Sequence, residues 1–247
     1  MPFATVEDAL AAIRAGRMVI VVDDEDRENE GDLTLAAEAV TPEAVNFMAS
    51  YGKGLICVPL TAARCEALHL PPMVAENTAP LGTAFCVSVE ARRGVGTGIS
   101  AADRATTIRL LADPAATAAD FTRPGHVFPL RATAGGVLAR AGQTEAAVDL
   151  ARLAGLQPAG VICEILTAAG AMARGPELAA FAATHRLPLL TVQALIEYRL
   201  KRERLIQPVA STPLPTRAGP FTARLYQSQV DGKHHLALVR GSPTPER

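Results

Sequence analysis

Short apolar runs alternate with amphipathic stretches over about the first 200 residues of the chain. An apolar run of about 4–8 residues has the length of a strand, whereas apolar residues spaced three and four apart predict a helix. Strands that alternate with helices at this spacing predict a three-layer α/β domain. The strand-like runs are Met18–Val22, Leu33–Ala37, Leu55–Pro59, Ala84–Val89, Val127–Ala132, Val161–Leu166 and Leu189-Leu190.

Hydroxyl side chains mark the starts of the predicted helices. Thr5 and Ser100 each have an aspartate three residues further on, a spacing that resembles a capping box. Thr144 is the predicted cap of a helix from Glu145 to Ala154. Further helices are expected after Thr41-Pro42, over Thr61–Leu68, from Pro176 to Thr184 and from Thr191 to Tyr198.

The pattern changes after residue 205. We predict a linker over Lys201–Arg204 and Pro208–Pro215, because charged residues and prolines replace the periodic apolar positions. Two strand-like pieces, Thr222–Gln227 and His235–Arg240, flank Asp231-Gly232, which favours a hairpin. The expected organisation is therefore one domain over residues 1–205 and a short tail over 206–247.

Composition excludes several classes of function. The net charge of −1 gives no electrostatic footprint for nucleic acid or an anionic membrane. No apolar run reaches the length of a membrane span, and the amino terminus lacks a signal-peptide pattern, so we expect a cytoplasmic protein. The four cysteines contain no Cys-x-x-Cys pair and are predicted to be reduced and mostly buried: Cys57, Cys65, Cys86 and Cys163.

The segment from Asp23 to Asp32 holds seven acidic residues and one base, Arg27, directly after an apolar strand. Repelling acids cost stability unless a cation or a cationic partner offsets them. A carboxylate-rich loop at the end of a strand also lies where open α/β sheets bind small molecules. The alternative is a solvated acidic turn, but the buried strand before it and Arg27 within it favour a binding site.

Three further stretches carry candidate chemistry. The Gly-rich loop Arg92–Ser100 and the segment Arg140–Thr144 each precede a helix, where backbone amides can hold an anion. Glu164 interrupts an apolar strand, and a carboxylate there is more often functional or paired than idle. His126 follows a Pro-Gly turn and, on these grounds alone, is more often a structural hydrogen-bonding group than a catalyst.

Four motifs in the chain belong together: Asp23–Leu33, Gly98–Arg104, Arg123–Leu130 and Val161–Ile165. In this order they resemble the 3,4-dihydroxy-2-butanone 4-phosphate synthase family over residues 1 to about 200. The resemblance implies a mixed, twisted sheet between helical layers, a homodimer, and conversion of ribulose 5-phosphate to formate and a four-carbon butanone phosphate. It also implies magnesium as the cofactor, with manganese as a substitute.

The resemblance also implies roles for individual residues. His126 and Glu164 match the two residues of catalysis, and Glu28 and Gln143 occupy the positions of the two protein ligands to magnesium. The implied substrate contacts are Arg27, Glu28, Asp32, Thr97, Arg140, Gly142, Gln143, Thr144 and Glu164.

The chain departs from the family pattern at two positions. Gln143 stands where the family loop has a histidine, and Gly96 stands where threonine is usual. An amide oxygen is acceptable to magnesium, but it cannot act as an imidazole does. We therefore expect weaker metal binding or slower turnover, and two other functions stay open: a divergent enzyme for another phosphorylated ketose, and a catalytically weak scaffold for a cyclohydrolase partner.

The tail resembles the start of GTP cyclohydrolase II at Leu214–Phe221 and Asp231–Val239. In that family the zinc-binding cysteines and the GTP site come later in the chain. We therefore expect no activity of the tail by itself.

Overall fold

The strand-like runs of the sequence meet in one seven-stranded sheet with the order β4-β5-β3-β6-β2-β1-β7. The structure, a computed structural model, describes residues 3–24 and 26–242 and divides into two compact units, Met1–Tyr198 and Arg199–Arg247. The strands of the first unit are β1 Val19–Val22, β2 Gly31–Ala36, β3 Cys57–Leu60, β4 Val89–Ala91, β5 Phe121–Arg131, β6 Gly160–Glu164 and β7 Leu189–Thr191.

The sheet is mixed. β1 pairs in parallel with β7, and β3 pairs in parallel with β5, whereas β2 runs antiparallel to both β1 and β6. All residues of β1 and β2 are buried, since both faces of the sheet are covered. The predicted fold class, a mixed sheet between helical layers, is thereby confirmed.

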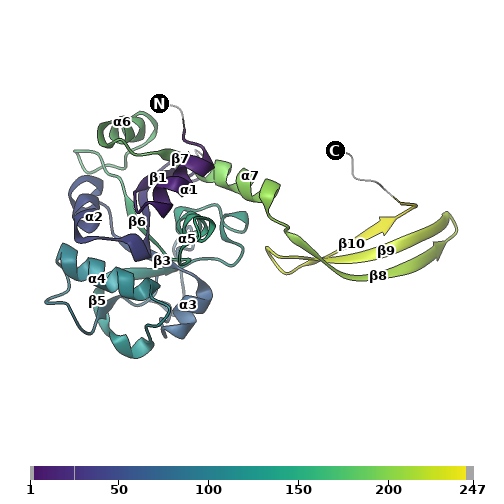
Figure 1. Cartoon of the computed structure of the whole chain (residues 1–247), viewed down its shortest axis with the longest axis horizontal. Coiled ribbons are helices and arrows are strands. Elements are labelled where there is room, and N and C mark those ends of the chain that lie inside the picture. The colour runs from purple at the N-terminus through teal and green to yellow at the C-terminus, as the bar shows by residue number, and fades with distance from the viewer. Residues whose placement is uncertain (1–2, 25, 243–247) are drawn as a thin grey trace. The chain divides into compact units, whose positions relative to one another are not determined.

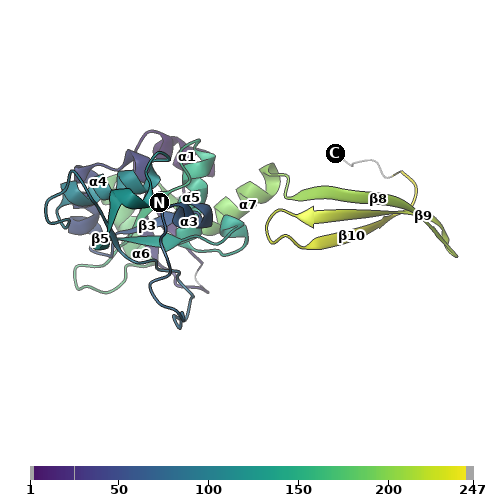
Figure 2. The same ribbon diagram turned by 90° about the horizontal axis from the view of Figure 1, so that it is seen from below.

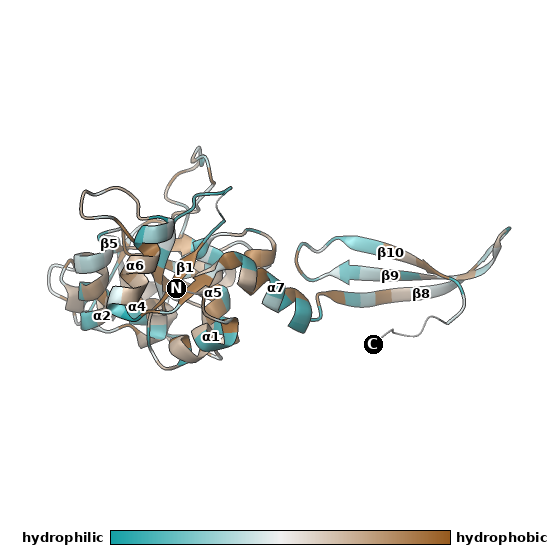
Figure 3. Cartoon of the chain, turned by 90° about the horizontal axis from the view of Figure 1, so that it is seen from above, coloured by the Kyte–Doolittle hydropathy of each residue, from teal (hydrophilic) through white to brown (hydrophobic). Residues whose placement is uncertain are grey.

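Helices cover the two faces of the sheet (Figure 1). Buried residues of α2, α4 and α6 share one hydrophobic cluster with Ile20 and Leu33, and those of α1, α5 and α7 share another with Val19 and Val21. Figure 3 shows both hydrophilic and hydrophobic residues on α1, and its buried residues recur at the three- and four-residue spacing of one helix face: Val6, Ala9, Leu10, Ala12 and Ile13. The helices are α1 Val6–Arg14, α2 Pro42–Phe47, α3 Ala62–Ala67, α4 Ala101–Ala112, α5 Gln143–Leu153, α6 Gly175–His185 and α7 Val192–Arg202.

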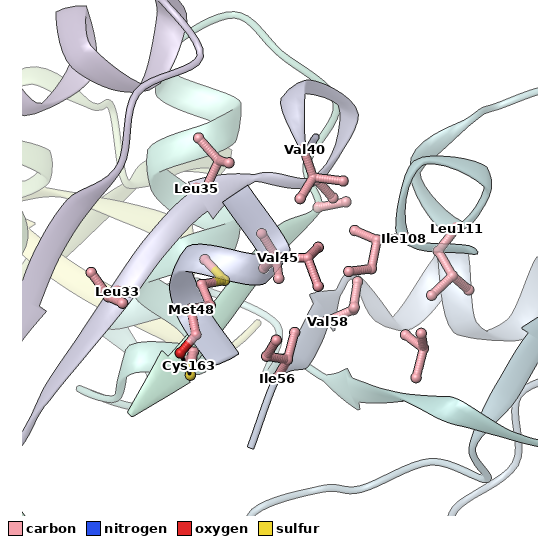
Figure 4. Packing of buried hydrophobic residues seen from close by; sticks show 14 of the residues in the cluster. Leu33, Leu35, Val40, Val45, Met48, Ile56, Val58, Ile108, Leu111 and Cys163 are labelled. Atoms are coloured by element: carbon pink, nitrogen blue, oxygen red, sulfur yellow. Dashed lines mark hydrogen bonds between the residues drawn. The ribbon is translucent and has the colours of Figure 1, made fainter. Parts of the chain in front are cut away.

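The larger cluster fixes the strands that carry the candidate site. Leu33 of β2 and Cys163 of β6 are fully buried and pack with Met48 and Val45 (Figure 4). Burying each large aliphatic side chain contributes about 1.5–3 kcal/mol. Neighbouring positions on the same two strands, Asp32 and Glu164, are thus held by an apolar core next to them.

Several predicted boundaries differ from the structure. The strand predicted over Ala84–Val89 is instead β4 Val89–Ala91, and Phe85 and Cys86 form only isolated bridges. β5 begins at Phe121 rather than Val127, because the Arg123–His126 segment continues the strand instead of forming a separate turn. α5 begins at Gln143, so its N-cap is Gly142 and not Thr144. The caps at Thr5 and Ser100 are confirmed, since each hydroxyl accepts a hydrogen bond from the amide three residues on.

The second unit contains a three-stranded antiparallel sheet with the order β10-β9-β8 (Figure 2). Its strands are β8 Ile206–Thr216, β9 Gly219–Ser228 and β10 His234–Val239. The hairpin predicted at Asp231-Gly232 is confirmed by the pairing of β9 with β10. The linker expected over Pro208–Pro215 is instead part of β8, an edge strand, where prolines are tolerated because one side makes no ladder.

Candidate active site

A hollow of about 150 Å³ opens where the acidic loop after β1 meets the start of α5 and the ends of β2 and β6. Nine of its thirteen lining residues are polar or charged, and the other four are Cys57, Phe85, Leu130 and Ile162. The polar and charged residues are Arg27, Glu28, Glu30, Asp32, Thr83, Arg140, Gln143, Thr144 and Glu164. Residues far apart in the sequence therefore share one small polar space.

The acidic loop is organised around Asp23, whose side chain is fully buried. Its carboxylate pairs with Arg27 and accepts hydrogen bonds from the amides of Glu28 (3.3 Å) and Glu30 (2.9 Å). Arg27 Nη1 also lies 2.6 Å from Glu28 Oε2. Burial alone would lower the pKa of Arg27, but the hydrogen bond and charges of Asp23 and Glu28 outweigh it and raise that pKa.

Gln143 and Glu28 meet on one nitrogen of Arg27. Arg27 Nη1 donates to Gln143 Oε1 at 3.2 Å and to Glu28 Oε2 at 2.6 Å. Gln143 Nε2 donates to the carbonyl of Glu30 at 3.4 Å, which turns Gln143 Oε1 toward Arg27. The cationic nitrogen thus stands between the two oxygens that the resemblance assigns to magnesium.

This donor set fits a hard divalent cation, because both ligands are oxygens and already converge on a positive charge. Two protein ligands suffice for magnesium, which keeps several waters. Within residues 3–24 and 26–242, no group of three or more His, Cys, Asp or Glu side chains is arranged to hold a metal ion. A metal held here would therefore depend on Glu28, Gln143 and waters or substrate oxygens.

Arg140 and the start of α5 line the hollow next to Arg27. Arg140 Nη1 lies 2.7 Å from Oε2 of Glu145, which is buried, and Arg140 Nη2 donates to the carbonyl of Leu81 at 3.2 Å. Gly142 is the N-cap of α5, so no side chain caps the first-turn amides of the helix, two of whose residues, Gln143 and Thr144, line the hollow. An arginine next to a helix amino terminus suits a phosphate group.

Asp32 and Glu164 form the floor of the hollow on adjacent strands. Glu164 Oε2 accepts a hydrogen bond from the amide of Leu55 at 2.8 Å. Burial, followed by the charge of Glu164, raises the pKa of Asp32 well above its usual value. Burial also raises the pKa of Glu30, although its ion pair with Arg174 opposes this. Burial therefore shifts the pKa of two carboxyl groups of the hollow, and shifted pKa values are typical of sites that transfer protons.

Three predicted site residues do not line this hollow: Gly142, which directly precedes the lining residue Gln143, and the more distant pair His126 and Thr97. His126, on β5, places Nδ1 2.8 Å from Glu90 Oε2, and about half of its side chain is exposed. Thr97 is exposed in the loop after β4, next to Gly98, whose amide donates to Asp103 at 3.0 Å. These residues form a second cluster around Glu90.

Sequence reasoning missed three carboxylates that hold the predicted residues in place. Asp23 orients Arg27, Glu145 orients Arg140, and Glu90 contacts His126. Glu90 could have been found by the signal that pointed to Glu164, a carboxylate within an apolar strand. No local signal separated Asp23 from its acidic neighbours.

A larger hollow, about 780 Å³, borders α4 and contains none of the residues to which the resemblance gives a role, although Arg92 and Arg93 of the Gly-rich loop line it. Arg92 Nε donates to the carbonyl of Ala119 at 2.7 Å, and Arg109 Nη1 donates to that of Val40 at 2.9 Å. Glu38 accepts from the amide of Gln157 at 2.7 Å. These contacts tie backbone segments together, so we place the candidate active site in the smaller hollow.

Comparison with known proteins gives two family matches. The family model of 3,4-dihydroxy-2-butanone 4-phosphate synthase matches residues 7–198, and that of GTP cyclohydrolase II matches residues 207–247. The riboflavin biosynthesis protein RibBA of Aquifex aeolicus is 60% identical over 241 residues, which cover 97% of this chain and 59% of that protein. The chain thus spans about three fifths of the length of the curated relatives it matches.

Two solved structures are similar over much of the chain. RibBX, a two-domain 3,4-dihydroxy-2-butanone 4-phosphate synthase from A. baumannii, is 47% identical with a TM-score of 0.89, covering 96% of this chain and 70% of that one. A 3,4-dihydroxy-2-butanone 4-phosphate synthase in complex with two magnesium ions is 48% identical with a TM-score of 0.79, covering 81% of this chain and 98% of that one. On this evidence the chain belongs to the 3,4-dihydroxy-2-butanone 4-phosphate synthase family.

Proposed function

We propose that this chain is a lyase of riboflavin biosynthesis that converts D-ribulose 5-phosphate to L-3,4-dihydroxybutan-2-one 4-phosphate and formate. The observation that carries the proposal is the single hollow in which Arg27, Glu28, Arg140, Gln143 and Glu164 converge. Family membership supports the same reaction.

The donors of the hollow suit the two ends of the substrate. Arg140 and the start of α5 bind the phosphate, because a guanidinium and a helix amino terminus both favour an anion. Arg27 and Glu28 face the hydroxyl and carbonyl groups at the other end. Asp32 contributes a further substrate contact from the floor.

Magnesium is the proposed cofactor, with Glu28 and Gln143 as its protein ligands and manganese as a substitute. The magnesium complex of a family member supports this choice. When bound, the ion stabilises the negative charge that develops on substrate oxygens as a proton leaves the carbon next to the ketone. Glu164 and His126 move protons during the rearrangement of the carbon skeleton.

A homodimer completes the proposed site. Strands rise about 3.3 Å per residue, so His126 stands roughly 13 Å along β5 from Leu130, which lines the hollow. The half-exposed imidazole is instead free to reach the hollow of a second copy. We therefore propose that His126 of one copy serves the hollow formed by Glu28 and Glu164 of the other.

The proposal divides the chain into a synthase domain over residues 1–205 and a tail over 206–247 without activity of its own. Within the part of the chain that the structure describes, no helix is long and apolar enough to cross a bilayer. The proposed location is the cytoplasm, and the proposed partners are a phosphosugar and a second copy of the chain.

The test is incubation of the purified chain with ribulose 5-phosphate while formate is followed, with magnesium present or removed by a chelator. We expect formate only in the presence of the divalent cation. Gln143 favours one other candidate, an enzyme for a different phosphorylated ketose, because it changes a ligand position of the family. Formate from xylulose 5-phosphate but not ribulose 5-phosphate would favour that candidate.

A further inference from the structure

Glu90 and His126 are brought together by an irregularity in the sheet. Val89 pairs with Val127, whereas the next residue of β4, Glu90, pairs with Thr122, so the register shifts between Val89 and Glu90. The intervening residues of β5 have no counterpart on β4. Such bulges re-aim a side chain, and here Glu90 Oε2 lies 2.8 Å from Nδ1 of His126.

Two glycines let the backbone close around the Glu90 carboxylate. Gly98 has a φ of +91°, and a Cβ on it would overlap the carboxylate of Glu90. A Cβ on Gly125 would overlap the carbonyl of Val89, and the amide of Gly125 donates to the hydroxyl of Ser88 at 3.2 Å. The carboxylate is therefore enclosed by the loop that carries Thr97 and by the segment of β5 that carries His126.

The enclosed Glu90 carboxylate destabilises the fold, which points to a functional role for it. Oε1 of Glu90 is buried and has no hydrogen-bond partner among residues 3–24 and 26–242. A buried polar atom without a hydrogen-bond partner destabilises a fold, and does so more strongly when it is charged. Asp103, by contrast, accepts from the amides of Gly96 (3.1 Å) and Gly98 (3.0 Å) and so already fixes the loop without Glu90.

We propose that Glu90 is a positioning residue for His126, a role that rests on the proposed function. An ionised carboxylate only accepts hydrogen bonds, so the neutral imidazole carries its proton on Nδ1. Nε2 then holds the free lone pair, and the structure gives it no partner within the described residues. Because about half of the His126 side chain is exposed, Nε2 is the atom that exchanges a proton with substrate.

The tautomer is tested directly by ¹⁵N NMR of the resting protein at mildly alkaline pH. The His126 signals are assigned by their loss in His126→Ala. In the unmodified chain we expect the proton on Nδ1, and in Glu90→Gln we expect a shift of the population toward Nε2, because an amide also donates. A proton on Nε2 in the unmodified chain, or an unchanged population in Glu90→Gln, overturns the proposal.

Kinetics separate positioning from a loss of structure. For Glu90→Gln we expect kcat to fall at least about tenfold, as with other partners that orient an imidazole, while KM stays within about twofold. The matched control is Asp149→Asn, because Asp149 is a buried carboxylate that accepts from the amide of Val137 at 2.9 Å. Equal losses of kcat in the two variants would overturn the proposal.

The formate assay and the ¹⁵N NMR measurement test the proposed function and the role of Glu90 separately. If the unmodified chain releases no formate, the proposed function is wrong, but the tautomer of His126 still decides the role of Glu90. If Glu90→Gln does not fold, the tautomer in the unmodified chain and the kinetics of Glu90→Asp decide it. The aspartate keeps the charge but withdraws the carboxylate by one methylene, so kcat should fall in that variant too.

Discussion

Asp32 of β2 lies directly opposite Glu164 of β6, so two carboxyl groups face each other across neighbouring strands. Like charges at such positions destabilise a sheet. Burial and the charge of Glu164 accordingly raise the pKa of Asp32 well above its usual value. The fold thus tolerates a costly pair where the proposed reaction needs proton-transfer groups, as sites that trade stability for activity do.

Asp32→Asn should stabilise the metal-free protein at neutral pH. Because the pKa of Asp32 is raised on folding, the native state holds a proton that the unfolded chain releases, and stability falls as the pH rises from about 4 toward the native pKa. Asparagine does not titrate, so the Asp32→Asn variant keeps the folding stability that the unmodified chain loses as the pH rises. Thermal unfolding with a chelator present should show a higher Tm, by about 2–4 °C per kcal/mol gained, and little difference below about pH 4.

Asp103→Asn supplies a comparison of opposite sign. The hydrogen bond from the amide of Gly96 lowers the pKa of Asp103, so its contribution to stability is present above the unfolded-state pKa and is lost as the pH falls. This variant should therefore have a lower Tm at neutral pH. A lower Tm for Asp32→Asn as well would show that the facing carboxylates stabilise the sheet.

Gly142→Ala should weaken substrate binding without unfolding the chain. The added Cβ would lie 2.6 Å from Arg140 Nη1 and 3.2 Å from Arg27 Nη2, and Gly142 has no positive φ that would add backbone strain. The two guanidinium ends must move, so KM should rise about tenfold, which corresponds to about 1.4 kcal/mol. Steady-state kinetics of formate release measure this, with the exposed change Ala141→Ser as the control. An unchanged KM would remove Arg140 from the phosphate site.

The sequence indicates individual residues of the site more readily than it indicates which of them lie in contact in the fold. The acidic loop and Glu164 stand out locally, because an acid run after a strand and a carboxylate within a strand are both unusual. That Gln143 meets Glu28 on Arg27 depends on the packing of α5 against the sheet, which no short segment encodes. The resemblance supplied that link.

Other features escaped prediction for identifiable physical reasons. Asp23 is distinguished from the adjacent acids only by its depth in the fold. Gly142 has no side chain that could indicate a helix cap, so the sequence pattern favours the nearby hydroxyl of Thr144 as the N-cap. The prolines of β8 suggested a linker because the sequence does not reveal that the strand lies at an edge.

Glu164→Gln should lower kcat by at least about 100-fold, the usual contribution of a positioned acid or base. The amide oxygen can still accept the hydrogen bond from the Leu55 amide, so the backbone contact is kept and the proton transfer is lost. Glu38→Gln is the matched control, because Glu38 also accepts a backbone amide but lies outside the hollow. Similar formate rates for Glu164→Gln and the unmodified chain would exclude Glu164 from proton transfer.

Gln143→His should lower the magnesium concentration that gives half-maximal formate release by about tenfold, which corresponds to about 1.4 kcal/mol. Histidine is the residue that the family pattern has at this position, and Gln143 Oε1 already faces Glu28 across Arg27 Nη1. Magnesium titrations of the initial rate measure the change, with the exposed substitution Gln193→His as the control. If the magnesium dependence and the rate stay the same, Gln143 is not a metal ligand.

Mixing two inactive variants should restore activity if each hollow is completed by the partner copy. His126→Ala and Glu164→Ala remove groups that one chain does not bring into the same hollow. In a hybrid dimer, one of the two shared sites combines an intact His126 with an intact Glu164. After random subunit exchange we expect about a quarter of the unmodified specific activity, because half of the dimers are hybrids with one intact site. If His126 and Glu164 of the same copy acted together, every site in the mixture would lack one of them, and no formate above that of the separate variants would be released.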